Sequence, residues 1–108
     1  MTWLPEQGTG LHDHGGSIGA FCVVRGTIRE QVAIKTPAGA HEIRETTYGV
    51  TTTRAFGAQY IHDMTNLDSE PAVSVHIYAP NLTTLTRYHW SEQGPVAYLT
   101  EDVSAARA

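Results

Sequence analysis

The sequence predicts an all-β protein, folded as a sandwich or a small barrel with little helix. Many short segments alternate apolar with polar residues, which is the two-residue period of a half-buried strand. Glycine and proline turn signals separate these segments about every eight to twelve residues, a spacing typical of antiparallel sandwiches and barrels. No segment carries the apolar repeat of a helix for more than a turn or two.

The expected strands follow one another along the whole chain. Residues 6–10 and 36–39 read as turns, and Gly15-Gly16-Ser17 breaks an early strand. Three β-branched threonines at residues 51–53 favour an extended conformation. The tail at residues 104–108 is helix-prone but too short to be stable alone. Strands are expected at residues 2–5, 11–14, 20–25, 27–35, 41–48, 50–56, 60–62, 72–78, 83–90 and 96–100.

Length and composition indicate one domain spanning residues 1–108. Hydrophobic residues make up 41% and charged residues 17%, which is typical of a globular chain. The net charge of −4, without a basic patch, argues against nucleic acid or an anionic membrane as partner. The single Cys22 and the lack of a signal peptide or long apolar segment predict a cytoplasmic protein. Exposed strand edges are compatible with a monomer or a homodimer.

Histidine is abundant, with six in 108 residues. His12 and His14 alternate on one short segment, so on a strand both imidazoles would project to the same face. His62 follows much later in the chain. Three imidazoles that converge would form a metal site with open positions, and their softness suits iron, zinc, copper or nickel. Taken singly, such histidines are more often surface residues on an edge strand.

The segment at residues 72–78 has the cleanest strand pattern. Ser74, His76 and Tyr78 share one face, and valine and isoleucine side chains form the other. If the polar face meets water, it needs no explanation. If it points inward, the three groups must hydrogen-bond to one another, and the Tyr78 hydroxyl at the end of the chain could act as an acid or a donor.

The spacing around the histidines resembles the two sequence motifs of the cupin superfamily. Gly19 and Gly26 follow the first histidine pair, and Gly49, Gly57 and Asn66 flank His62. This resemblance implies a small double-stranded β-helix, the cupin or jelly-roll barrel, with the ligands pointing into its interior. Gly19 stands about where many cupins have a fourth, glutamate ligand, so the implied site holds three histidines without a carboxylate.

Three segments together resemble the cysteine dioxygenase family of thiol dioxygenases, within the cupin superfamily. They agree with it in order and spacing, and the resemblance extends from about Trp3 to Tyr88. The segments are Gly8-Thr9-Gly10-Leu11-His12-Asp13-His14-Gly15-Gly16-Ser17, His62-Asp63-Met64-Thr65-Asn66 and Ala72-Val73-Ser74-Val75-His76-Ile77-Tyr78-Ala79-Pro80.

The resemblance implies a complete set of functional groups. One ferrous ion would be bound by His12, His14 and His62, and the family's catalytic relay would be Ser74, His76 and Tyr78. A small thiol and O2 would be the substrates and a sulfinic acid the product. Zinc or nickel could replace iron in the purified protein.

Three departures from the family pattern concern the crosslink, the substrate arginine and the N-terminus. Gly19 occupies the place of the cysteine that crosslinks to the relay tyrosine in animal members, so no crosslink is expected. The upstream arginine and the N-terminal helical segment that are usual in the family are missing from this chain. In relatives that prefer mercaptopropionate, the carboxylate is bound downstream of the relay tyrosine, where Arg87 lies. Arg87 and Tyr60 are therefore the candidate substrate-binding residues, although Arg87 could equally be a solvated surface residue.

The leading hypothesis is an iron- and O2-dependent thiol dioxygenase that oxidises cysteine or a 3-mercaptopropionate-type thiol to its sulfinic acid. One alternative is a truncated, non-catalytic metal-binding cupin, which the late start and missing arginine favour. Another is a different metal-dependent cupin oxygenase or isomerase. The row of Ser74, His76 and Tyr78 separates the first hypothesis from the last, because other cupins have no need of it.

Overall fold

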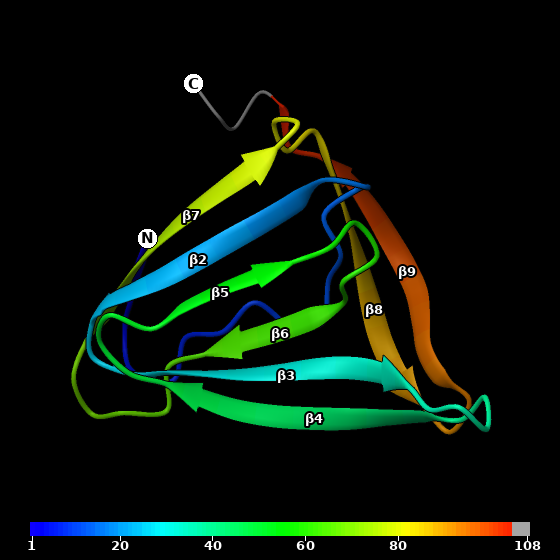
Figure 1. Cartoon of the computed structure of the whole chain (residues 1–108), viewed down its shortest axis with the longest axis horizontal. Helices are drawn as coiled ribbons and strands as arrows, with labels where there is room; N and C mark the ends of the chain where they lie inside the picture. The colour runs from blue at the N-terminus through cyan, green and yellow to red at the C-terminus, as the bar shows by residue number, and fades with distance from the viewer. Residues whose placement is uncertain (105–108) are drawn as a thin grey trace.

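The computed structural model of the chain describes residues 1–104, and β-strands account for almost all of its regular structure (Figure 1). The all-β prediction is therefore confirmed. Residues 105–108 of the helix-prone tail lie outside the described residues. Within residues 1–104 there is no helix that could cross a membrane. The strands are β1 (Thr2–Trp3), β2 (Ile18–Arg25), β3 (Ile28–Lys35), β4 (His41–Tyr48), β5 (Thr53–Phe56), β6 (His62–Thr65), β7 (Ala72–Ala79), β8 (Thr84–Ser91) and β9 (Gly94–Asp102).

Two antiparallel layers face each other, as expected for the small double-stranded barrel. One layer has the strand order β1-β7-β2-β5. The other contains β4-β3-β6 and the hairpin β8–β9, which are joined through single bridges from His12 to His62 and to Arg87. In Figure 1 the hairpin runs across the ends of the other strands and closes that side of the molecule. Strand segments distant in sequence therefore meet at His12.

The hydrophobic core lies between the two layers. Its side chains come from both sheets and from the N-terminal strand β1, so apolar burial holds the layers together. One part of this interior is polar, because several histidines, Glu30 and Ser74 are also buried. The buried apolar residues are Trp3, Phe21, Val23, Ile28, Phe56, Met64 and Ala72.

Strand β7 turns its polar face inward. Ser74 is fully buried, whereas Val75 and Ile77 on the opposite face are 54% and 67% exposed. The pairing with β2 places Gly19 opposite Tyr78 and Phe21 opposite His76, which sets this row beside the core. Of the two orientations that the alternation allowed, the inward one is present.

Several expected strands differ in extent. Strand β1 ends at Trp3 and not at residue 5, and β6 covers His62–Thr65 and not residues 60–62. Two further differences have a physical cause in the structure. Residues 11–14 form no regular strand and pair only through the single bridges at His12. Strand β5 begins at Thr53, because Thr51 adopts a positive φ of 69° in a turn that the backbone of Val23 anchors. A tertiary hydrogen bond from the Thr51 amide to the Val23 carbonyl thus overrides the β-preference of the threonines.

Candidate metal centre

A reciprocal pair of backbone hydrogen bonds brings His12 and His62 together. The amide of each donates to the carbonyl of the other at 3.0 Å. On its other side the same segment pairs with β8, because the Asp13 amide donates to Thr86 and the Tyr88 amide donates to Leu11. The His12–His14 segment is therefore held between β6 and β8, and this pairing replaces the regular strand that the sequence predicted.

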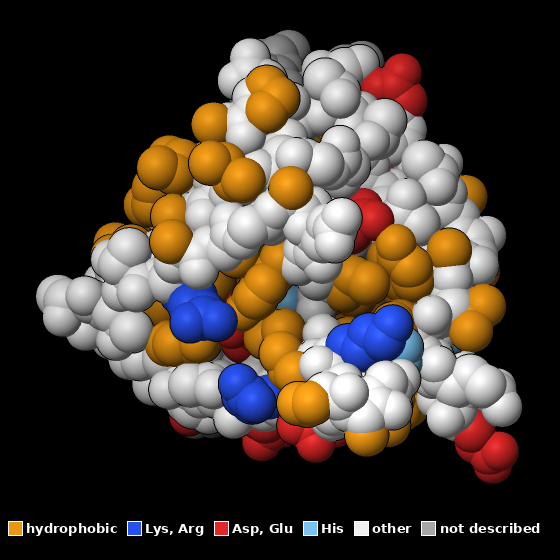
Figure 2. Space-filling model, turned by 45° about the vertical axis from the view of Figure 1, so that its right-hand side comes forward, with side chains coloured by type: hydrophobic (Ala, Val, Ile, Leu, Met, Phe, Trp, Pro, Cys, Tyr) orange, Lys and Arg blue, Asp and Glu red, His pale blue; other side chains and the backbone are white. Residues whose placement is uncertain are grey.

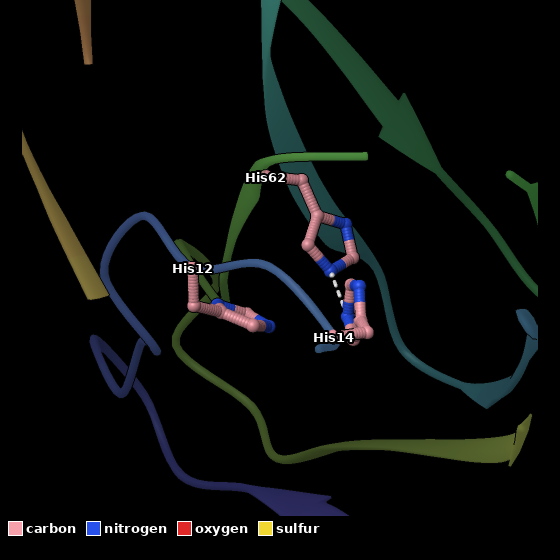
Figure 3. Close-up of side chains that lie close together, drawn as sticks. All are labelled: His12, His14 and His62. Atoms are coloured by element: carbon pink, nitrogen blue, oxygen red, sulfur yellow. Dashed lines mark hydrogen bonds between the residues drawn. The ribbon is translucent and has the colours of Figure 1, made fainter. Parts of the chain in front are cut away.

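The three imidazoles of His12, His14 and His62 converge on one point (Figure 3). One ring nitrogen from each lies within 4.8 Å of the others, and all three residues are buried. The Nε2 atoms of His14 and His62 are 3.2 Å apart. Three nitrogen atoms at this separation can surround one metal ion, since metal–imidazole bonds are about 2 Å long.

Hydrogen bonds orient two of these rings for metal binding. The Gly10 carbonyl can only accept, so Nδ1 of His12 carries the proton that is shared over 2.9 Å. The Nδ1 atom of His62 likewise donates to the Glu30 carboxylate at 2.6 Å. Both rings therefore direct Nε2 toward the cluster, and a metal binds that nitrogen in its unprotonated form. This donor set fits a divalent transition metal.

The ring of His14 is held by stacking instead. Its Nδ1 is buried and finds no hydrogen-bond partner among residues 1–104. Phe56 lies against it with ring centroids 4.5 Å apart, and Tyr78 stacks at 5.6 Å. A Cβ atom on Gly19 would come within 2.5 Å of the Phe56 ring, so a side chain at position 19 would displace that ring. Phe56 therefore occupies the space near the position of the missing fourth ligand.

The electrostatic environment keeps His12 and His14 neutral. Burial, together with the neighbouring His62, lowers the pKa of His12 to about 4. Burial followed by the proximity of His62 and His12 lowers the pKa of His14 to about 3. Neutral imidazoles at physiological pH are available as ligands without first losing a proton.

Glu30 was not singled out by the sequence analysis, yet it contacts a candidate ligand. It is buried on β3 and accepts hydrogen bonds from His62 and from the Tyr48 hydroxyl, the latter at 3.1 Å. Burial alone would raise the pKa of Glu30, but the hydrogen bonds from His62, Tyr60 and Tyr48 lower it below its ordinary value. One signal was present, because Glu30 is in phase with Ile28 and Val32 on the inward face.

Asp13 holds the histidine segment from the opposite side. Its carboxylate accepts from the Gly15 and Thr86 amides and, at 2.8 Å, from the Tyr88 hydroxyl. Burial raises the pKa of Asp13, but these donors outweigh it and the net shift is downward. Burial and the nearby Asp13 raise the pKa of Tyr88 to about 12. Asp13 therefore fixes the backbone between His12 and His14 without joining the cluster.

The polar row on β7 is hydrogen-bonded and begins at Trp3. The indole Nε1 of Trp3 donates to Ser74 Oγ at 2.8 Å, and Ser74 Oγ shares a hydrogen bond with His76 Nε2 at 2.7 Å. Burial, with the positive N-terminus and His62 nearby, lowers the pKa of His76 to about 4. The Tyr78 ring lies roughly parallel to that of His76, with centroids 6.5 Å apart.

A cavity of about 390 Å³ opens beside the histidines. Its size suits a small molecule. On the face drawn in Figure 2, hydrophobic side chains gather around the centre, with Lys or Arg side chains among them. No aspartate or glutamate is among the described residues that line the cavity. These are Met1, Trp3, Gly8, Thr9, His12, His62, Met64, His76, Tyr78, Leu82, Leu85 and Arg87.

The two candidate substrate-binding residues lie in different places. Arg87 lines the cavity, where its guanidinium donates to Glu101 at 2.7 Å and to the Thr9 carbonyl at 2.9 Å. It is thus a hydrogen-bonded residue of the cavity wall whose side chain is 31% exposed, and its role in substrate binding stays a prediction. Tyr60 is not among the residues that line the cavity; its ring stacks on Phe56 and meets His62 edge-on.

A protein-family model described as cysteine dioxygenase type I matches residues 1–91. The chain belongs to this family. The match covers every histidine of the cluster and the polar row on β7, and only β9 among the strands lies beyond it. Membership in the cysteine dioxygenase type I family, together with the histidine cluster, identifies a cupin in which three histidines could hold a metal ion.

Solved structures with low sequence identity share the fold. An oxalate oxidase has a TM-score of 0.70 at 12% identity, over 88% of this chain and 48% of its own. A protein from Thermus thermophilus has a TM-score of 0.60 at 22% identity, over 73% of this chain and 67% of its own. The Drosophila melanogaster CENP-C cupin domain has a TM-score of 0.63 at 13% identity, over 73% of this chain and 57% of its own. This chain thus spans only about half of the oxalate oxidase and the CENP-C structure.

Proposed function

We propose that this chain is an iron-dependent thiol dioxygenase that converts a small thiol and O2 into a sulfinic acid. The observation that carries the proposal is the convergence of His12, His14 and His62 beside a cavity that His76 and Tyr78 also line. Family membership supports the same assignment. In the overall reaction, RSH and O2 give RSO2⁻ and H⁺, so both oxygen atoms reach sulfur and no outside reductant is consumed.

The cavity wall supports a carboxylate on the substrate. Arg87 uses two of its five N–H donors on Glu101 and Thr9, and the others can bind a carboxylate oxygen. The described lining offers no carboxylate to pair with a substrate ammonium group. We therefore propose that an amine-free thiol such as 3-mercaptopropionate is preferred over cysteine. Apolar side chains from Met64, Leu82 and Leu85 would contact its methylene chain.

The β7 row supplies the proton-handling groups of this proposal. Trp3 holds the Ser74 hydroxyl, and that hydroxyl holds His76 through Nε2, which leaves Nδ1 of His76 for a second hydrogen bond. Tyr78 lines the cavity next to His76 and would orient the substrate or donate a proton at its hydroxyl. Tyr60 would act indirectly by packing against the ring of His62.

Bound iron would supply a Lewis acid that favours the thiolate and the one-electron chemistry that O2 requires. His12 and His62 hold their rings with Nε2 directed to the same place, and both side chains are buried. The cavity beside them would hold the substrate next to the metal, which would make the reaction effectively intramolecular.

Oxygen uptake with isotopically labelled O2 tests the proposal directly. Protein loaded with Fe(II) under nitrogen is mixed with 3-mercaptopropionate or cysteine, and the product is weighed by mass spectrometry. We expect one sulfinate carrying two labelled oxygen atoms per O2 consumed, with kcat/KM higher for 3-mercaptopropionate. No thiol-dependent uptake from iron-loaded protein would favour a non-catalytic metal-binding cupin. Uptake or isomerisation with another substrate alone would favour a different cupin enzyme.

A further inference from the structure

Glu30 is a buried carboxylate that touches the candidate metal centre from outside the cluster. Its side chain is 1% exposed, and its Oε2 lies 2.6 Å from Nδ1 of His62. Burying a carboxylate in a core is costly unless hydrogen bonds satisfy it. Neither the three-histidine set nor the cavity beside it requires a charge at this position.

We infer that Glu30 is a positioning residue: it holds His62 with the proton on Nδ1 and thereby keeps Nε2 unprotonated and aimed at the metal. The inference rests on the proposed histidine metal centre, and it names a group outside the three ligands. A carboxylate that accepts from a ligating imidazole also makes the other ring nitrogen a stronger donor.

The three histidines differ in what holds them, and His62 has the only charged partner in this role. His12 donates to the neutral Gly10 carbonyl, and His14 Nδ1 has no hydrogen-bond partner among residues 1–104. A charge-assisted hydrogen bond is shorter and roughly twice as strong as a neutral one. The Glu30–His62 contact at 2.6 Å agrees with this, whereas the His12–Gly10 contact measures 2.9 Å. His62 is therefore the most firmly oriented ring of the cluster.

A hydrogen bond from Tyr48 in turn orients Glu30. The Tyr48 hydroxyl donates to Oε1 at 3.1 Å, on the oxygen that His62 does not use. Tyr60 contributes to the lowered pKa of this carboxylate, and its hydroxyl receives the Arg54 Nε–H at 3.4 Å. Each carboxylate oxygen thus has a defined donor. This arrangement leaves the carboxylate little freedom to rotate away from His62.

A purely structural ion pair between Glu30 and a protonated His62 is the competing interpretation. In that case both ring nitrogens of His62 would carry protons, and the Nε2 proton would point at His14, 3.2 Å away. Long-range ¹H–¹⁵N NMR spectra of the metal-free protein at pH 7.5 separate the two cases. The inference expects one protonated nitrogen, Nδ1, on His62. Two protonated nitrogens, or a proton on Nε2 alone, would overturn it.

Metal affinity provides the second readout. Glu30→Gln keeps the side-chain shape and removes the charge, and Glu45→Gln makes the same change at an exposed residue of β4 as the matched control. Kd for Zn²⁺ alone is measured by competition with a chromophoric chelator. We expect about 10- to 100-fold weaker binding for Glu30→Gln, a smaller loss for Tyr48→Phe, and no change for Glu45→Gln.

A Zn²⁺ affinity of Glu30→Gln within twofold of the wild type would overturn the inference. If Glu30→Gln does not fold, Tyr48→Phe and the wild-type NMR spectrum decide, with an unchanged Kd for Tyr48→Phe counting against it. Failure of the proposed function is distinguishable, because neither measurement uses turnover. Protein that binds Zn²⁺ through His62 but oxidises no thiol retains this inference and loses the dioxygenase proposal.

Discussion

Strand β3 places charged side chains outside and Glu30 inside, whereas β7 places Val75 and Ile77 outside and Ser74 and His76 inside. Both strands alternate with the same period, so the period shows which residues share a face but not which face is buried. The partners decide that. Glu30 meets His62 and Tyr48 in the interior, and Ser74 meets Trp3 and His76.

The two strands also serve different parts of the site. The inward polar group of β3 contacts a candidate metal ligand from behind and does not line the cavity. The inward row of β7 ends in His76 and Tyr78, both of which do line it. We therefore expect changes on the histidine and β3 side to alter metal binding, and changes on β7 to alter turnover with the metal retained.

The largest effect is expected from His62→Ala, which removes a ligand and not merely its support. Metal affinity should fall by more than the ~100-fold that loss of an outer-shell partner causes. Metal content after dialysis, measured by mass spectrometry, checks this. His89→Ala is the control, because His89 is exposed on β8 and does not line the cavity. Equal metal content in the two variants would contradict the ligand assignment.

Tyr78→Phe should separate turnover from metal binding. Loss of the hydroxyl should lower kcat by about 10²- to 10⁴-fold, the usual contribution of a proton-transferring group, with metal content unchanged. The phenyl ring keeps the stacking with His14, so the cluster should remain intact. Metal analysis and thiol-dependent O2 uptake on the same sample provide the measurement. Full activity, or loss of the metal, would contradict the expectation that β7 affects turnover while the histidine and β3 side affects metal binding.

Lowering the pH should destabilise the metal-free protein already between pH 6.5 and 5.5, which is above the pH at which carboxylates become protonated. The pKa values of His12 and His76 are about 4 and that of His14 about 3, whereas an unfolded histidine titrates near 6.5. Below pH 6.5 the unfolded chain therefore binds more protons, and the free energy of unfolding decreases as pH falls toward 4. Three such groups should cost about 2–4 kcal/mol between pH 6.5 and 5.5.

Urea unfolding at pH 7.5, 6.5 and 5.5 measures this loss. His76→Gln should reduce the slope by about a third, since it removes one of the three groups. A free energy of unfolding that stays constant from pH 7.5 to 5.5 would contradict the neutral, buried state of these histidines.

The smallest effect is expected from one valine substitution on each strand, which compares the inward face of β3 with the outward face of β7. Val32 points inward on β3 and is 6% exposed, whereas Val75 points outward on β7. Val32→Thr buries a hydroxyl and should cost about 1–3 kcal/mol, while Val75→Thr should stay within about 0.5 kcal/mol. Chemical denaturation gives both values. Equal costs would mean that the outer face of β7 is not exposed in solution.

Much of the fold and the site could be predicted from the sequence because they depend on local patterns. Alternation located β3, β4 and β7, and the spacing of His12, His14 and His62 indicated a shared site. His12 and His14, however, do not share a face because they lie on a regular strand, as the sequence had predicted. Residues 11–14 pair through single bridges, and the backbone contacts to His62 and Arg87 direct the imidazoles.

What the sequence could not supply were the partners that come from elsewhere in the fold. Trp3 anchors Ser74 across 71 positions of the chain, and no local pattern predicts that contact. Glu30 was recognisable in principle, because a glutamate in phase with buried isoleucine and valine is unusual unless it has a partner. Its partner is His62 on the neighbouring strand β6, which only the sheet register identifies.

X-ray absorption at the zinc edge of Zn²⁺-loaded protein tests the central claim most directly, namely that three imidazoles bind one ion. We predict one ion per chain with three imidazole nitrogens at about 2.0–2.1 Å, and two imidazoles in His62→Ala. A sulfur ligand, or an unchanged spectrum in His62→Ala, would contradict the account.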